Sequence, residues 1–325
     1  MTDDQQPIDS LVAEQESERR QFFRTAFGAA AVTVAGAAAL TIGPRAFADT
    51  TSDVDFLNFA LQLKYLEAQF YNFAAFGTGL PAGQITAGSA TLTGTNVAGD
   101  ATGARQVSFT DPVVAQIAGE IAQDAAAHVA WLRTELGANT YAQPAIDLGT
   151  TATGAFSTAM RAATVISGAS ATFDPYASDA NFLLAAFLLA DIGVTALRYS
   201  APLLADIGHV ELIEGAMVTD AYHSAAIRTL LYAKGVDTTN SLRLNARLIS
   251  DLRDALDGTP DDDQGVTTIP PSDVSNVVPT YADGTIYARG AGSLLNILFL
   301  NSAQVTKGGF FPNGVNGTVV TSTAN

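Results

Sequence analysis

Four long apolar segments with helical periodicity constrain the fold of this chain more than any other feature of its 325 residues. In residues 53–76, apolar side chains such as Phe59 and Leu63 recur at steps of three and four, which places them on one face of a helix. Asp53 is the expected N-cap of this helix, and Gly77 is its expected end. Similar patterns predict helices over residues 111–136, 178–204 and 205–234. The chain is therefore expected to be all-α.

The connections between these segments predict how the helices are ordered. Residues 78–110 are rich in Gly, Thr and Ala and carry hardly any charge, which is typical of a long loop or a short hairpin. Residues 138–176 form a second long link, with a short helical patch near residues 154–164. Two locally joined helix pairs with one long crossover between them make a four-helix bundle with the connectivity of ferritin-like folds.

We expect residues 49–240 to form this bundle and residues 241–325 to form a C-terminal extension that packs on it. The extension should contain a short amphipathic helix over residues 241–256, an irregular stretch over residues 257–290 and an apolar patch over residues 293–300. Four aspartates in the irregular stretch lack the alternating ligand spacing and the Gly of a calcium loop, so a solvated acidic turn is predicted there instead. These aspartates are Asp257, Asp261, Asp262 and Asp263.

The first 48 residues have the composition of an export signal rather than of a folded domain. Arg19 and Arg20 are followed by x-Phe-Phe-Arg, which resembles the twin-arginine motif. A small-x-small sequence predicts cleavage after Ala48, although the Ala/Gly-rich run over residues 25–43 is also about long enough to be a transmembrane anchor. A cleaved signal implies the twin-arginine translocase as a partner, a periplasmic or extracellular location and no stable membrane anchor afterwards.

Composition excludes several kinds of site. The chain has no Cys, which rules out disulfides, zinc–thiolate sites, iron–sulfur clusters and thiol nucleophiles. Its formal net charge of −16 repels phosphate backbones and argues against a nucleic-acid partner. After residue 48 the sequence contains only five Glu, which limits any site built from glutamates.

Two histidines lie at matching positions of an internal repeat. After His128 and again after His223, Ala follows at the second position, Arg at the fifth, Thr at the sixth and Leu at the eighth. The two arginines are Arg133 and Arg228. The repeat indicates two helical hairpins related by a pseudo-two-fold axis, in agreement with the loop lengths.

Several runs of sequence resemble the ferritin-like domain family that includes the desiccation-related proteins. They read DVDFLNFALQLKYLEAQFY, EIAQDAAAHVAWLRTELG, VTDAYHSAAIRTLL and GGFFPNGVNG. The resemblance implies a bundle that holds two metal ions, with one Glu from each of the first and third helices and a Glu-x-x-His pair from each of the second and fourth. Carboxylate and imidazole at this spacing share one helix face.

Three of the ligand positions that the resemblance implies carry other residues here. Ala125 stands three residues before His128, where the second helix should supply Glu. Ala190 stands at the position expected for the Glu of the third helix, and the internal repeat pairs Ala190 with Lys64 of the first helix. If the Glu of the first helix belongs at position 64, a cation has replaced it; if it belongs at position 67, Glu67 retains it. These degenerate positions remove the six-residue cage for two metals.

The residues that remain are two carboxylates and two imidazoles, namely Glu67, His128, Asp220 and His223. They could hold a single Fe, Mn or Zn ion. The alternative is a buried ion pair between Asp220 and Lys64, in which the ammonium replaces the charge of a metal. Asp124, four residues before His128, lies about 40° round the helix and would assist only with a suitable rotamer.

Three functions follow from these observations. The first is a non-catalytic, exported, structural or stress-related envelope protein with no cofactor. The second is a mononuclear metal-binding protein or metal-dependent oxidoreductase that uses the remaining His and carboxylate ligands. The third is a binding module in which the loop of residues 78–110 contacts a partner. Whether the chain forms a homo-oligomer or binds an envelope partner is left open by the sequence.

Overall fold

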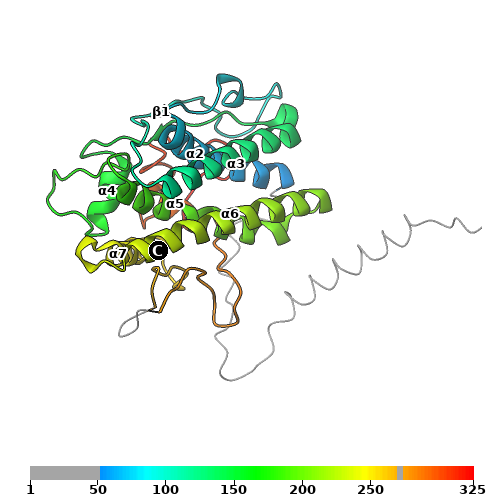
Figure 1. Ribbon diagram of the computed structural model, residues 1–325. Coiled ribbons are helices and arrows are strands. Elements are labelled where there is room, and N and C mark those ends of the chain that lie inside the picture. The colour runs from blue at the N-terminus through cyan, green and yellow to red at the C-terminus, as the bar shows by residue number, and fades with distance from the viewer. Residues whose placement is uncertain (1–51, 269–273) are drawn as a thin grey trace, which may run out of the picture. The chain divides into compact units, whose positions relative to one another are not determined.

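The computed structural model describes residues 52–268 and 274–325, and in this part four long helices form an all-α bundle (Figure 1). The predicted export segment, with Arg19, Arg20 and Ala48, lies outside the described residues. The bundle helices are α2 (Asp53–Phe76), α3 (Pro112–Leu136), α5 (Asp179–Ser200) and α6 (Ile207–Lys234). The all-α prediction is confirmed, and the helix bounds agree with the predicted segments to within a few residues.

The helices pack in the pairs that the loop lengths predicted. Helix α2 packs along α3, and α5 packs along α6, while contacts of α2 with α5 and of α3 with α6 close the bundle. The link between the two pairs contains α4 (Ala155–Ala162) and is the long crossover of the prediction. The interior is filled by aromatic and aliphatic side chains, and the Phe70 ring stacks on the Phe182 ring with centroids 5.7 Å apart.

The start of α2 differs from its prediction. Ser52, rather than Asp53, is the N-cap, because its side chain accepts from the backbone N–H of Asp55 while the Asp55 carboxylate accepts from the backbone N–H of Ser52. Asp53 instead accepts hydrogen bonds from the backbone N–H groups of Ala205 and Asp206, and so ties α2 to the start of α6. The predicted end is confirmed, since Gly77 has a left-handed φ of 75°.

The two long loops lie against each other rather than forming separate hairpins. Strand β1 (Ala101–Thr102) pairs in parallel with β2 (Ile146–Asp147), so the short hairpin expected as one alternative for residues 78–110 is wrong. A Cβ atom on Gly103, whose φ is 80°, would lie 2.4 Å from the Gly149 backbone. This close approach explains why the loops are rich in glycine.

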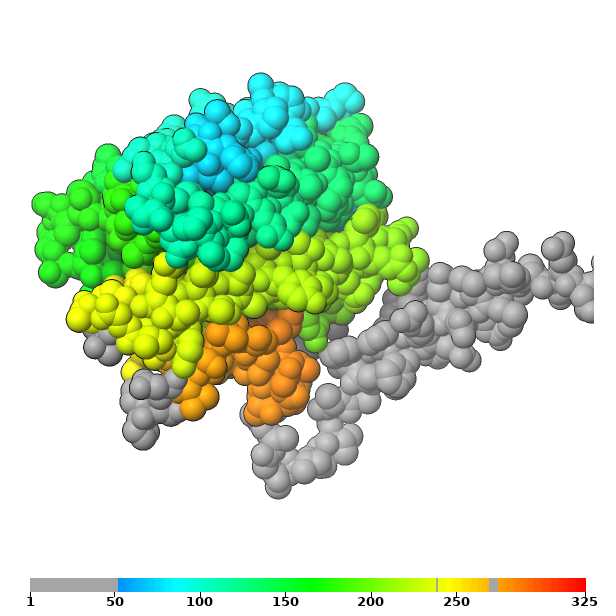
Figure 2. Space-filling view, in the orientation of Figure 1, coloured from blue at the N-terminus to red at the C-terminus, as the bar shows by residue number. Residues whose placement is uncertain are grey.

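The C-terminal extension contains helices α7 (Leu242–Asp257) and α8 (Ala291–Phe299). Helix α7 contacts α5 and α6, and α8 contacts α5 and α7. Figure 2 shows residues of the extension, in orange, directly against the yellow-green surface of α6 and α7. The last residues return to the loops, where the Asn316 side chain donates to the carbonyl of Val97.

One helical segment, Asp179–Leu203, is long and apolar enough to cross a membrane, as judged over the described part of the chain. Of its most apolar window, 83% is buried inside the protein. This burial is explained by the contacts of α5 with α2, α6, α7 and α8.

Candidate functional site

Three of the four predicted ligands meet in the middle of the bundle. Glu67 from α2, His128 from α3 and Asp220 from α6 surround the side chain of Lys64. We call this group the lysine cluster and define it as Lys64, Glu67, His128 and Asp220. His223, the fourth predicted ligand, is not part of it.

Lys64 lies at the centre of this cluster, and only 1% of the residue is exposed. Its Nζ donates to the carboxylate of Asp220 and, over 2.6 Å, to Glu67 Oε2. The predicted alternative of a buried ion pair between Lys64 and Asp220 is therefore confirmed. Burial alone would lower the pKa of Lys64, but the charges of Asp220 and Glu67 outweigh it and raise the pKa, which keeps the ammonium protonated.

The Glu67 carboxyl group has a raised pKa. Burial and the neighbouring charge of Asp220 raise its pKa to about 7, against the lowering effect of Lys64. Space for this side chain comes from Gly193 on α5, where a Cβ atom would lie 2.5 Å from Glu67 Oε1 and 2.9 Å from Asp220 Oδ2. The ammonium of Lys64 thus bonds to two carboxylates, and Glu67 is partly protonated near neutral pH.

His128 has an unpaired ring nitrogen. Its Nδ1 lies 3.6 Å from Asp220 Oδ1, which is beyond hydrogen-bonding distance, and has no hydrogen-bond partner. Burial and the positive charge of Lys64 lower the pKa of His128 to about 4, so the ring is neutral at physiological pH. The position matches that of a metal ligand, but the nearest charged group on its side is the Lys64–Asp220 pair.

His223 bonds to Asp124 on α3 rather than to a residue of the lysine cluster. The distance between His223 Nε2 and Asp124 Oδ2 is 3.0 Å, and 43% of the Asp124 side chain is exposed. From the sequence, Asp124 was expected to assist His128 only with a suitable rotamer. In the structure it bonds to His223 instead. The pair therefore belongs to the rim of the bundle.

The residues present do not fit a two-metal centre. A divalent ion held by Glu67 and Asp220 would lie next to the ammonium of Lys64, which already occupies both carboxylates. Ala125 and Ala190 are buried and supply no ligand atom. Within residues 52–268 and 274–325, no group of three or more His, Asp or Glu side chains is arranged to hold a metal ion.

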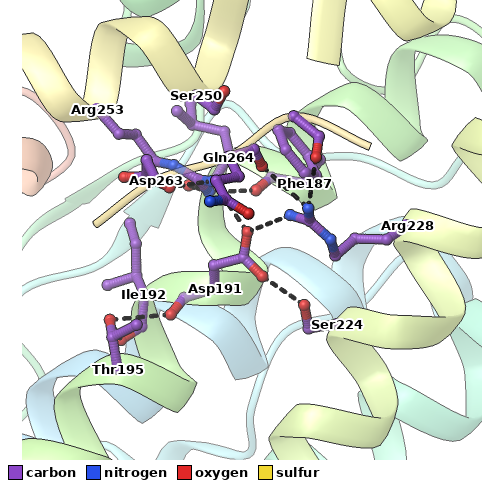
Figure 3. A network of polar contacts seen from close by, with 12 residues as sticks. Phe187, Asp191, Ile192, Thr195, Ser224, Arg228, Ser250, Arg253, Asp263 and Gln264 are labelled. Carbon is purple, nitrogen blue, oxygen red and sulfur yellow. Dashed lines mark hydrogen bonds and ion pairs between the residues drawn. The ribbon is translucent and has the colours of Figure 1, made fainter. Parts of the chain in front are cut away.

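A second buried cluster was not predicted from the sequence. Asp191 on α5 accepts from Arg228 over 2.8 Å and from Arg253 over 2.9 Å, and Ser224 also donates to it (Figure 3). Neither arginine side chain is exposed. Although burial alone would raise the pKa of Asp191, the two arginines lower it to about 2. The carboxylate is therefore permanently charged.

This network continues into the C-terminal extension. Asp263 bonds to Arg253 over 2.5 Å and also to Arg289, which bonds in turn to Asp257 over 2.5 Å. The arginine cluster is thus Asp191, Arg228, Arg253, Asp257, Asp263 and Arg289. The prediction of a solvated acidic turn is wrong for Asp257 and Asp263, whose side chains are 4% and 1% exposed, and for Asp262, which is also buried. A usable signal was Arg228, since a cation within the largely apolar run of residues 224–231 needs a buried anion if it faces the core.

Comparison with known proteins identifies the family. The sequence profile described as the ferritin-like domain matches residues 52–233, more than half of the chain. The chain belongs to the ferritin-like domain family. This result agrees with the resemblance noted in the sequence and with the bundle connectivity.

Two curated proteins with different names are similar to this chain. The chain is 26% identical over 285 residues to the ferritin-like catalase Nec2 of Nesocodon mauritianus, and the match covers 82% of this chain and 85% of that protein. It is 28% identical over 216 residues to the desiccation-related protein PCC13-62 of Craterostigma plantagineum, covering 63% and 62% of the two chains. The chain thus spans less than two thirds of the desiccation-related protein. No solved structure matches this sequence.

Proposed function

We propose that this chain is a non-catalytic ferritin-like protein in which the ammonium of Lys64 supplies the charge that metal ions supply elsewhere in this fold. The observation that carries the proposal is the pair of bonds from Lys64 Nζ to Glu67 and Asp220. Two carboxylates in a bundle core need a positive partner, and a lysine on α2 provides one without a cofactor.

The proposal includes a structural or stress-related role in the cell envelope, with no cofactor. It is supported by the similarity to a protein named as desiccation-related and by the export-like sequence around Arg19 and Arg20. The twin-arginine translocase would then be a partner during export, and the mature protein would be periplasmic or extracellular, acting as a homo-oligomer or with an envelope partner. Arg19→Lys/Arg20→Lys should leave the full-length precursor in the cytoplasm in a fractionation experiment. Export of this variant at the wild-type rate would contradict the twin-arginine route.

Elemental analysis tests the metal-free part of the proposal. Protein purified after export, and the same protein incubated with Fe, Mn and Zn and then desalted, should contain no stoichiometric metal. The matched control is His128→Ala/His223→Ala, which removes both imidazoles. Stoichiometric metal in the wild type that this variant loses would overturn the proposal.

The second candidate is a mononuclear metal-binding protein or metal-dependent oxidoreductase using Glu67, His128, Asp220 and His223. It is favoured by the relative named as a ferritin-like catalase, whose match covers 82% of this chain, and by the unpaired Nδ1 of buried His128. This candidate predicts oxygen release from hydrogen peroxide by protein loaded with Fe or Mn. A rate equal to that of His128→Ala would exclude it.

A further inference from the structure

In the lysine cluster, the amine of Lys64 is in contact with the carboxyl groups of Asp220 and Glu67 at a buried site. We propose that Lys64 and Asp220 become joined by an amide bond between Lys64 Nζ and Asp220 Cγ, with Glu67 transferring the protons. The bond would crosslink α2 to α6 through residues that are 156 positions apart in the chain. The inference rests on the proposed function, because the Lys64–Asp220 ion pair that takes the place of a metal is the reactant, and the amide would keep both side chains in that place.

Proximity and burial favour the reaction. Lys64 Nζ is in direct contact with the Asp220 carboxylate, and their side chains are only 2% and 7% exposed. Groups held in contact by a folded scaffold react as if at very high concentration, so condensation can proceed without prior activation of the carboxyl group. Exclusion of water from the pair also opposes hydrolysis of the product.

Glu67 is placed to move the protons. Its Oε2 accepts from Lys64 Nζ over 2.6 Å, and its Oε1 and Asp220 Oδ2 both face the space above Gly193. A carboxylate in direct contact with the ammonium can accept a proton from it and pass it on to the neighbouring Asp220. His128 Nδ1 lies 3.6 Å from Asp220 Oδ1, so an Nδ1–H of its neutral ring would stand near the oxyanion that develops on Asp220.

The reaction balances without a co-reactant. The ammonium of Lys64 gives a proton to Glu67, and the free amine attacks Asp220 Cγ, forming the new C–N bond. Glu67 then passes the proton to Asp220 Oδ2, and a second proton from the nitrogen follows. The Cγ–Oδ2 bond breaks, and one water molecule leaves. Nothing is oxidised or reduced, and two buried charges are replaced by a neutral amide, which relieves their desolvation cost.

The chain contains its own control pair. Lys234 and Asp111 form an ion pair at 2.6 Å between α6 and the N-cap of α3. Their side chains are 30% and 29% exposed, and within residues 52–268 and 274–325 no second carboxylate forms an ion pair with Lys234. If contact alone sufficed, this pair would also condense. The proposal requires that it does not, because water surrounds it and no acid–base group assists.

Tryptic mapping of the denatured wild-type protein by mass spectrometry tests the proposal. We expect no cleavage after Lys64 and a joined species made of the peptide ending at Arg105 and the peptide of residues 199–228, lighter than their sum by one water. Cleavage after Lys234 and a free peptide containing Asp111 are expected in the same digest. Complete cleavage after Lys64 with a free 199–228 peptide would overturn the proposal. So would a loss of water confined to the first peptide, because this would indicate a Lys64–Glu67 lactam.

Two variants separate the chemistry from the fold. Glu67→Gln keeps the shape of the side chain but cannot transfer protons, and should give unjoined peptides. Lys64→Arg keeps the charge but removes the nucleophile, and should also give unjoined peptides. Circular dichroism reports whether each variant is folded. Crosslinking in Glu67→Gln at the wild-type level would overturn the role of Glu67. Metal content measured on the same wild-type sample distinguishes the failures, since metal-free, unjoined protein overturns this inference alone and stoichiometric metal overturns the proposed function.

Discussion

The protein contains two buried charge clusters, and buried carboxylates are compensated by different cations in each. In the arginine cluster, Asp191 accepts from two guanidinium groups and a hydroxyl, and its pKa falls to about 2 because the arginines outweigh the effect of burial. In the lysine cluster, a single ammonium serves two carboxylates, and burial raises the pKa of Glu67 to about 7. The first is a fixed set of charges, whereas the second holds a proton that can leave near neutral pH.

The difference follows from the chemistry of the two cations. A guanidinium has five donors in a planar fork that can bond several oxygens at once, and it stays charged when buried. The ammonium of Lys64 is a compact point charge whose donors are divided between Glu67 and Asp220. We infer that the arginine cluster holds the C-terminal extension on the bundle, and that the lysine cluster marks the position left by the metal site of the family.

Removing the central anion of the arginine cluster should have the largest effect on stability. Asp191→Ala leaves Arg228 and Arg253 buried without that carboxylate, and we expect it to lower the free energy of unfolding by roughly 3–5 kcal/mol. Urea denaturation measures this loss. The control is Asp251→Ala at an exposed pair with Arg247, which should change stability by less than about 0.5 kcal/mol. Equal effects of the two variants would show that the arginine cluster contributes little.

Removing the cation of the lysine cluster should cost less and should depend on pH. Lys64→Met leaves Glu67 and Asp220 without their partner, and we expect a loss of roughly 2–3 kcal/mol at pH 8. At pH 5.5 the loss should be smaller, because Glu67 is then protonated and only one buried charge needs compensation. Denaturation at the two pH values measures this. A loss that is the same at both would contradict the distinction between the clusters.

The smallest expected effect is on the pH dependence of stability. The pKa of Glu67 is raised from an ordinary 4.5 to about 7, so the folded state binds the extra proton and loses stability as pH rises between these values. Glu67→Gln should remove this slope, which amounts to roughly 1–2 kcal/mol between pH 5.5 and pH 7. Asp257, whose pKa burial also raises to about 7, is present in both proteins and cancels in the comparison. The exposed control Glu211→Gln should keep the wild-type slope.

The sequence predicted the bundle well because helical periodicity is a local property. The apolar steps in residues 53–76 and the turn at Gly77 determine that helix almost by themselves. The ion pair of Lys64 with Asp220 could also be anticipated, since the internal repeat pairs Lys64 with the position expected for a ligand Glu, and a carboxylate in the bundle core needs a cation. Both inferences need only the pattern within single helices and the expectation of which helix positions face the bundle interior.

The arginine cluster could not be anticipated in the same way. Asp263 lies in a Pro- and Gly-containing stretch whose composition is typical of a solvated turn, and only the folded extension brings it to Arg253 and Arg289. The position of His223 was missed for a related reason. Spacing along the helix places His223 near the cluster, but its side chain turns to Asp124 on the neighbouring helix instead.

Metal binding by wild type and Lys64→Glu tests most directly whether Lys64 takes the place of a metal. Thermal melts of both proteins, with and without Fe(II), Mn(II) or Zn(II) under anaerobic conditions, report binding because a ligand of the folded state raises the melting temperature. Our account predicts that Lys64→Glu is stabilised by at least one of these ions, that adding His128→Ala abolishes the effect, and that the wild type does not respond. Stabilisation of the wild type to the same extent as Lys64→Glu would contradict the account.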